Sequence, residues 1–275
     1  MALNEQTYPK ESFEVIVIDN GSDDHIDQLV SEFSFVKMTS ESSQSQFAAR
    51  NKGLSIACGE IVAFTDSDCL PAANWIEQGV KSLAGATDRV VAGKITIYPR
   101  DPNHPTSVEL YDMITGLAQQ TYVEKLHFGA TANLFAFRQQ FDKAGFFDAQ
   151  TKSSGDLEWG QRAYSLGCDL IYADDVEVRH PARRSFTDLH NKVTRTIGGV
   201  HSLAKRRRST FSHPLERSLL SDLVPPVNYC IHILRDYRLQ TLTEKVQIVL
   251  VAFFVRYAEA SERLRLQLGG VERRR

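Results

Sequence analysis

Two uninterrupted apolar segments that end in carboxylates constrain the fold of this chain more than any other feature. Residues 13–19 read FEVIVID and are followed by the turn residues Asn-Gly-Ser, and residues 60–65 lead directly into Asp66-Ser67-Asp68. Apolar runs without alternation are typical of strands buried on both faces, as in parallel sheets. Because ligands bind at the carboxyl ends of strands in open α/β sheets, we expect both acidic ends at a binding edge.

Helical patterns separate the predicted strands. Residues 23–35, 47–58 and 71–83 have the spacing or boundary residues of helices, and residues 35–38 and 90–98 are predicted as further strands. The repeated order of strand and helix indicates an α/β domain with a mostly parallel central sheet.

Composition excludes several classes of protein. The chain has 275 residues, of which 42% are hydrophobic, and this is enough for one large domain or for a smaller domain with an extension. Its apolar runs are shorter than the roughly 18 residues that a membrane-spanning helix needs. The N-terminal residues lack the pattern of a signal peptide. Four cysteines without a CxxC spacing are expected to be free thiols in a reducing compartment, so a cytoplasmic location is expected.

Charge divides the chain unevenly. Residues 1–178 carry 13 basic and 26 acidic side chains, whereas residues 179–275 carry 19 and 8. We therefore predict a catalytic domain over residues 1–184 and a basic helical extension over residues 185–275, with helices near 185–207, 214–235 and 242–268. An acidic body suits a cation site, and a basic tail suits an anionic partner such as the inner face of a membrane. The alternative is that the two parts neutralise each other.

Asp66 and Asp68 form the sharpest local signal. Two carboxylates one residue apart at a strand end can reach a single hard cation, and that cation would neutralise a departing diphosphate. The plain alternative is a turn, or a cap for the helix that follows Pro71.

The ordered set of motifs carries more information than any one of them. The segments are FEVIVIDNGSDD at 13–24, AARNKGLSIACGEIVAFTDSDCLP at 48–71, GATANLFAFR at 129–138 and GDLEWGQRAYSLG at 155–167. In this order the chain resembles the family 2 glycosyltransferases, over about residues 3–195. The resemblance implies a GT-A fold, which is Rossmann-like, together with a nucleotide-sugar donor, a divalent metal (Mn²⁺ or Mg²⁺) and an inverting reaction.

Donor contacts follow from the resemblance residue by residue. Asp19 and Asn20 match the positions beside the base and ribose, although many members have Asp at the position of Asn20. Arg50 and Asn51 match contacts on the base and phosphate side, with a surface ion pair on a helix as the alternative. Asp66 matches the position near the ribose and the metal.

The resemblance also implies which residues bind the metal and which residue is the catalytic base. Asp68 matches the metal ligand proper, and His180, at a predicted strand end, completes the metal shell in some members. Asp156 matches the catalytic base, which takes the proton of the acceptor hydroxyl. The alternatives are a structural histidine and a helix N-cap.

Other residues near these motifs have open roles. Glu158 and Trp159 are expected to shape the acceptor pocket or to pack in the core. Arg183, Arg184 and Arg195 are expected to bind the diphosphate or an anionic acceptor, or to form a solvated basic face.

One departure from the family concerns the N-terminus. Members begin with a central strand and a helix before the segment that matches residues 13–19, and this chain has neither. The sequence therefore suggests a truncated chain or a misplaced start.

The function expected from the sequence is transfer of a sugar from a nucleotide sugar to a hydroxyl of a glycan or lipid-linked acceptor. Peripheral membrane contact through the basic helices is expected, and nucleic acid is not expected as a partner. The rivals are a nucleotidyltransferase and a non-catalytic remnant that acts as a scaffold.

Overall fold

The computed structural model describes residues 2–22, 26–207, 227–236, 238, 239 and 241–272, and it divides into two compact units. Unit 1 comprises residues 1–96 and 117–180, and unit 2 comprises residues 97–116 and 181–275. The last division between the units falls between His180 and Pro181, and the segment 97–116 belongs to unit 2.

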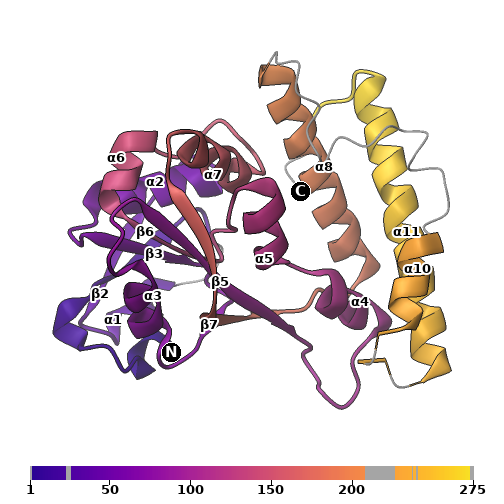
Figure 1. The fold of residues 1–275 in the computed structure, drawn as a ribbon, viewed down its shortest axis with the longest axis horizontal. Coiled ribbons are helices and arrows are strands. Elements are labelled where there is room, and N and C mark those ends of the chain that lie inside the picture. The colour runs from indigo at the N-terminus through magenta and orange to yellow at the C-terminus, as the bar shows by residue number, and fades with distance from the viewer. Residues whose placement is uncertain (1, 23–25, 208–226, 237, 240, 273–275) are drawn as a thin grey trace. The chain divides into compact units, whose positions relative to one another are not determined.

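Unit 1 is a mixed α/β structure (Figure 1). Its strands are β1 (Val15–Asp19), β2 (Val36–Ser40), β3 (Ile61–Thr65), β4 (Leu70–Pro71), β5 (Arg89–Tyr98), β6 (Asn133–Phe137) and β7 (Asp169–Pro181). Its α-helices are α1 (Ile26–Ser31), α2 (Gln46–Ile56), α3 (Trp75–Leu83), α5 (Gln119–Thr121), α6 (Arg138–Ala144) and α7 (Gly155–Ser165). Short 3₁₀ turns span Ala2–Glu5 and Lys10–Ser12, and a π-helical turn spans Tyr122–Leu126.

The strands form two sheets, one of two strands in the order β1-β2 and one of five in the order β3-β6-β5-β7-β4. β1 and β2 are parallel, but β6 is antiparallel to both β3 and β5, and β4 is antiparallel to β7. The expectation of a mostly parallel sheet is therefore wrong in this detail. A buried apolar strand has the same sequence pattern in either direction, so its direction is decided by its neighbours.

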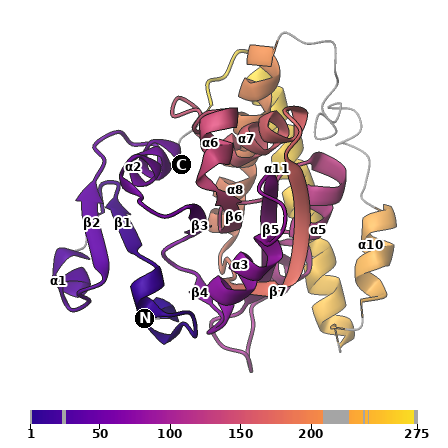
Figure 2. The same ribbon diagram turned by 60° about the vertical axis from the view of Figure 1, so that its left-hand side comes forward.

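Alternating side chains of the larger sheet pack on opposite faces. Val90, Ala92, Leu134 and Ala136 contact the core that includes side chains of α2, α6 and α7. Val91 and Phe135 pack instead in a second core with Trp75 and Ile76 of α3, and Figure 2 shows this helix beside the sheet. Helices therefore cover both faces, and this explains the unbroken apolar character of these strands.

β1 is less buried than its sequence suggests. All five of its residues are half-buried, although VIVID reads as a fully buried strand. β1 and β3 belong to separate sheets, so within the described residues β1 pairs only with β2. A two-stranded sheet covers little apolar surface, and this explains the partial exposure.

Unit 2 is helical, with α4 (Ser107–Thr115), α8 (Phe186–Arg207), α10 (Val227–Leu234) and α11 (Leu242–Gln267). Val108 and Tyr111 of α4 pack with Leu189 of α8 and Ile248 of α11 in one core, so α4 joins this unit. The predicted helix at 214–235 is observed only as α10, and residues 214–226 lie outside the described residues. Among the described helices, each is too short or too polar to cross a bilayer.

Candidate active site

The acidic motif forms a tight turn between two strands of the five-stranded sheet. β3 ends at Thr65, and the backbone amide of Cys69 then donates to the carbonyl oxygen of Asp66 at 3.0 Å. The chain continues into β4, where Leu70 is the partner of Arg179 in β7. This pairing brings the turn next to His180, the residue that follows Arg179.

Four potential ligand atoms gather at this turn. One side-chain atom from each of Asp66, Asp68, Cys69 and His180 lies within 4.8 Å of the other three. Nε2 of His180 is 4.0 Å from Oδ2 of Asp68, and the Asp68 side chain is 56% exposed, so its carboxylate is accessible to a ligand. The structure thus brings together the three residues predicted as metal ligands, which lie 114 residues apart at most along the chain.

Cys69 was predicted to be a packing residue, and it lies among the four. Its side chain is buried, and burial together with the charge of Asp66 raises the pKa of its thiol to about 12. Thiolates select softer metals, and the two carboxylates and the imidazole are the donors that suit a divalent ion such as Mn²⁺.

Arg50 extends the site from α2. Its Nη2 donates to Oδ1 of Asp66 at 2.8 Å. Its Nη1 is buried and has no hydrogen-bond partner among the described residues. Buried polar atoms without partners are rare in proteins, so this atom suits an oxygen of a ligand.

Asp156 approaches the same group from the first turn of α7. Its Oδ1 accepts a hydrogen bond from the Leu157 amide at 2.9 Å. Burial raises the pKa of its carboxyl group, while the nearby positive charge of Arg50 lowers it and the charge of Asp66 raises it further. The electrostatic coupling puts Arg50, Asp66 and Asp156 in one region. A carboxylate with a raised pKa is suited to accept a proton.

Backbone conformation and packing set the position of Asp156. The N-cap of α7 is Ser154, with a left-handed φ of 62°, so Asp156 is not the cap. A Cβ atom on Gly155 would lie 2.7 Å from the ring of Phe47, and this contact explains the glycine.

Asp19 and Asn20 lie at the end of β1. Oδ1 of Asp19 accepts from the Ser22 amide at 2.9 Å, and this hydrogen bond lowers the pKa of Asp19. Nδ2 of Asn20 donates to the carbonyl oxygens of Glu41 and Ser43. These bonds shape the loop after each strand of the small sheet. Within the described residues, no hydrogen bond joins Asp19 or Asn20 to Asp66 or Asp156.

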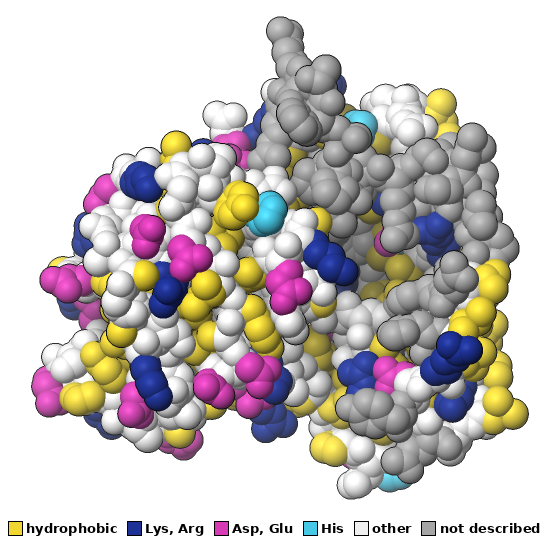
Figure 3. Space-filling model, in the orientation of Figure 1, with side chains coloured by type: hydrophobic (Ala, Val, Ile, Leu, Met, Phe, Trp, Pro, Cys, Tyr) yellow, Lys and Arg dark blue, Asp and Glu magenta, His cyan; other side chains and the backbone are white. Residues whose placement is uncertain are grey.

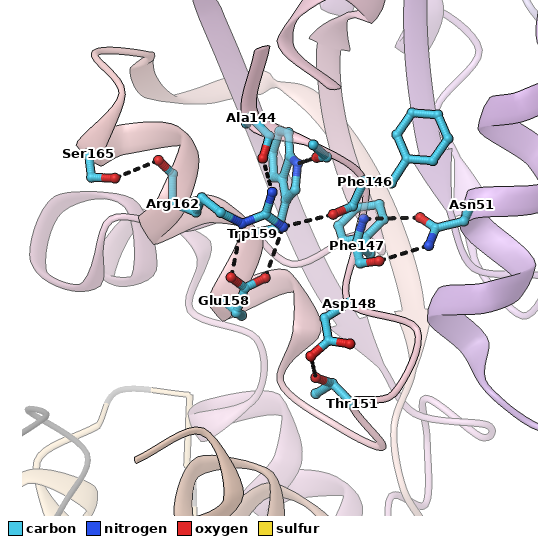
Figure 4. A network of polar contacts seen from close by, with 11 residues as sticks. Asn51, Ala144, Phe146, Phe147, Asp148, Thr151, Glu158, Trp159, Arg162 and Ser165 are labelled. Atoms are coloured by element: carbon cyan, nitrogen blue, oxygen red, sulfur yellow. Dashed lines mark hydrogen bonds and ion pairs between the residues drawn. The ribbon is translucent and has the colours of Figure 1, made fainter. Parts of the chain in front are cut away.

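Both polar groups of the Asn51 side chain bond to the backbone of Phe147. Its Oδ1 accepts from the Phe147 amide at 3.0 Å, and its Nδ2 donates to the Phe147 carbonyl at 2.8 Å (Figure 4). This pair of bonds fixes α2 to the loop before α7, and so helps to set Arg50 and Asp156 relative to each other.

Replacing Asn51 with Ala is expected to destabilise the protein by about 1–3 kcal/mol, because it leaves both polar groups of Phe147 unpaired. Chemical denaturation measures this loss. Asn51→Asp, which keeps the acceptor and removes the donor, is expected to lie between Ala and the wild type. If both variants keep normal stability but lose nucleotide affinity, Asn51 contacts the donor directly instead.

Glu158 and Trp159 support α7 from within. Glu158 accepts two hydrogen bonds from Arg162, each of 3.0 Å, and Arg162 also donates to the carbonyl oxygens of Ala144 and Phe146 (Figure 4). Trp159 is buried, and its ring stacks on Phe141 with centroids 4.5 Å apart. Of the two alternatives for Trp159, core packing is the one observed.

The arginines after His180 are engaged within unit 2. Arg183 forms an ion pair of 3.0 Å with the fully buried Asp112, which Lys192 also contacts at 2.9 Å, and the Arg184 guanidinium lies 3.4 Å from Glu109. These ion pairs tie the start of α8 to α4. Arg183 therefore pairs with a buried carboxylate and is not part of a purely solvated basic face.

Comparisons with known proteins place this site in a family. The profile described as Glycosyl transferase family 2 matches residues 2–146, which include Arg50 and the Asp66 turn. The chain belongs to glycosyl transferase family 2. Glycosyltransferase AglE of Haloferax volcanii is 33% identical over 273 residues, covering 96% of this chain and 88% of the relative. The protein is thus a glycosyltransferase, in agreement with the resemblance seen in the motifs.

Solved structures show the fold of this family member. A mannosyltransferase of Pyrobaculum calidifontis, PcManGT, in complex with GDP-Man and Mn²⁺ has a TM-score of 0.64 at 18% identity, covering 96% of this chain and 80% of the other. TarS 1-349 of S. aureus in complex with UDP-GlcNAc has a TM-score of 0.53 at 16% identity, covering 99% and 87%. These likenesses confirm the GT-A fold.

Proposed function

We propose that this glycosyltransferase moves a sugar from a nucleotide sugar to a hydroxyl of a glycan or lipid-linked glycan, with inversion and with the help of a divalent metal. The observation that carries this proposal is the convergence of Asp66, Asp68 and His180 beside the Arg50–Asp66 ion pair and the Asp156 carboxylate. At one end of this region the side chains suit the binding of a cation and a diphosphate. At the other end Asp156 can accept a proton.

Asp66, Asp68 and His180 would hold the metal, with Mn²⁺ favoured over Mg²⁺ because an imidazole lies among the donors. The bound ion would offset the negative charge of the diphosphate as it leaves. PcManGT, described above, is named with Mn²⁺ and GDP-Man, and this supports a similar requirement here.

Nη1 of Arg50 is the donor that the proposal assigns to a phosphate or ribose oxygen, because it is buried and unpartnered among the described residues. Its Nη2 keeps Asp66 oriented. Asp19, Asn20 and Asn51 remain proposals for the donor side. For Asn51 the role is one of position, since both of its amide groups contact Phe147.

Asp156 is the proposed base. Its Oδ1 is held by the Leu157 amide, and so Oδ2 is the oxygen that takes the proton of the acceptor hydroxyl. In a single displacement the acceptor oxygen attacks the anomeric carbon from the face opposite the diphosphate, and the configuration inverts. The raised pKa of Asp156 makes the protonated product of this transfer more favourable.

The test is transfer from radiolabelled GDP-mannose and UDP-GlcNAc to a panel of glycan and lipid-linked acceptors, with Mn²⁺, with Mg²⁺ and with a chelator. We expect metal-dependent transfer, and NMR of the product is expected to show the anomeric configuration opposite to that of the donor. Retention of configuration would contradict the single-displacement mechanism. Equal rates of transfer with and without the chelator would contradict the metal requirement.

We also propose that the acceptor is met at a membrane surface, with unit 2 in contact with lipid. The excess of basic side chains after residue 178 supports this contact.

A further inference from the structure

An unusual turn in unit 1 follows α5. The chain forms the π-helical turn Tyr122–Leu126, which ends at His127, and the backbone of His127 is left-handed with a φ of 55° and a ψ of 49°. A left-handed backbone is uncommon for residues other than glycine. Single π-helical turns and backbone outliers of this kind are both frequent at functional sites. The turn is therefore more than a simple connection between α5 and β6.

The ring of His127 stacks on the ring of Tyr164, near the end of α7. The two ring centroids are 3.9 Å apart, and the ring planes differ by 2°. Tyr164 is 47% exposed and His127 is half-buried, so both rings reach the surface. Figure 3 shows a histidine beside a hydrophobic side chain on the visible face, where α5 and α7 lie in Figure 1. We call His127 and Tyr164 the ring pair.

Contacts between the turn and α7 hold the ring pair in place. Nε2 of Gln161 donates to the carbonyl oxygen of Leu126 at 3.0 Å. A Cβ atom on Gly160 would lie 2.5 Å from Cβ of Phe128 and 3.2 Å from the carbonyl oxygen of His127. Glycine at this position therefore allows the turn to pack directly on α7. The ring pair is thus a fixed feature of unit 1.

The polar atoms at the edges of the ring pair are available to a ligand. Within the described residues, the ring nitrogens of His127 and the hydroxyl group of Tyr164 make no hydrogen bond. A flat aromatic surface with polar atoms at its edge suits a sugar, because the C–H groups of the sugar pack on the ring and its hydroxyl groups bond to the edge. A purely apolar ligand would leave these polar atoms unpaired.

The ring pair lies on the same helix as the proposed base. Tyr164 follows Asp156 by eight residues within α7. This spacing places Tyr164 about 12 Å farther along the helix and about 80° around its axis. The separation exceeds the length of one sugar unit. A sugar stacked on Tyr164 is therefore a different unit from the one whose hydroxyl group faces Asp156.

We propose that the ring pair is a subsite for the acceptor glycan, where it binds a sugar unit remote from the hydroxyl group that reacts. This inference rests on the proposed transfer to a glycan, and it adds that the acceptor is an oligosaccharide chain. His127 and Tyr164 act in binding and take no part in the chemical step, because they lie two helical turns beyond Asp156.

Binding of the full chain to an array of glycans, without donor and without metal, tests the subsite apart from the transfer reaction. We expect the wild type to bind oligosaccharides and not single sugars. Tyr164→Leu keeps an apolar side chain and removes the ring, and it is expected to weaken binding about fivefold. Tyr164→Phe keeps the ring, and we expect a loss of about threefold or less.

His127→Asn separates the ring from the backbone conformation. Asparagine adopts the left-handed conformation readily, so this variant removes the imidazole and preserves the turn. We expect it to weaken glycan binding about as much as Tyr164→Leu. Leu166→Ala is the matched control, because Leu166 is 46% exposed at the end of the same helix, and it is expected to bind glycans like the wild type. Thermal melts monitor the folding of each variant.

Transfer kinetics with an oligosaccharide acceptor provide a second measurement. Tyr164→Leu is expected to raise KM for the acceptor about fivefold and to leave kcat and KM for the donor near those of the wild type. Equal glycan binding by the wild type, Tyr164→Leu and His127→Asn would overturn the subsite, and so would a wild type that binds no glycan on the array. Glycan binding that depends on Tyr164 in a protein without transfer activity would support the subsite and contradict the proposed function instead.

Discussion

Replacing Asp156 with asparagine is expected to lower the single-turnover rate of glycosyl transfer about 10²–10⁴-fold, which corresponds to roughly 3–5 kcal/mol in the barrier. Asparagine keeps the acceptor for the Leu157 amide, so the start of α7 is preserved, but it cannot take a proton. Affinity for nucleotide and metal should remain near that of the wild type. Rapid-quench assays and thermal melts on the same samples measure both effects.

Glu158→Gln is the matched control for this experiment, since it lies in the same helical turn and its carboxylate is bonded to Arg162. We expect it to lower stability and to leave the chemical step nearly unchanged. Transfer by the wild type should fall as the pH is lowered, because protonated Asp156 is inactive. Burial raises the pKa of Asp156, and so this loss should begin at a higher pH than for an ordinary aspartate. Normal turnover in a folded Asp156→Asn protein would contradict the role of base.

Replacing Asp68 with asparagine is expected to weaken the metal-dependent binding of GDP or UDP at least about 100-fold. The change removes one of two carboxylates from the cluster with His180, and the loss of an outer partner alone costs about 10–100-fold in other metal sites. The side chain is more than half exposed, so the fold should be unaffected. Titration calorimetry with and without Mn²⁺ measures the difference.

Cys69→Ala tests in the same assay whether Cys69 binds the metal or only lies beside the metal ligands. The thiol is buried and is a softer donor than the carboxylates, and so we expect this variant to bind nucleotide and Mn²⁺ like the wild type. A large loss with Cys69→Ala and none with Asp68→Asn would reverse the assignment of ligands. If the wild type and both variants bind nucleotide without any dependence on metal, the proposed metal site is contradicted.

Local sequence determined which segments form elements and where the acidic turn lies. The apolar runs at 13–19 and 60–65 became β1 and β3, and the helix that begins near Asp156 became α7 with Gly167 after its end, at a φ of +84°. These features depend on neighbours in the chain, on periodicity and on the conformational freedom of glycine. The ordered motifs were also sufficient to indicate the family.

Tertiary structure decided what the candidate residues contact. Asn51 and Glu158 look alike as polar residues in functional motifs, yet the structure shows that their side chains bond to Phe147 and Arg162. The approach of His180 to Asp68 depends on the antiparallel pairing of β4 with β7, a contact between residues far apart in sequence.

The two faces of α11 also show that the sequence alone does not determine which side chains become buried. The sequence indicates a helix at 242–268 with an apolar face that includes Leu250 and Leu268, and it leaves open whether that face packs inward or remains accessible. The structure buries Ile248 and Val251 and leaves Leu250 and Leu268 exposed. Periodicity identifies an apolar face, but only the neighbouring helices determine which face loses contact with water, because burial is a property of the assembled core.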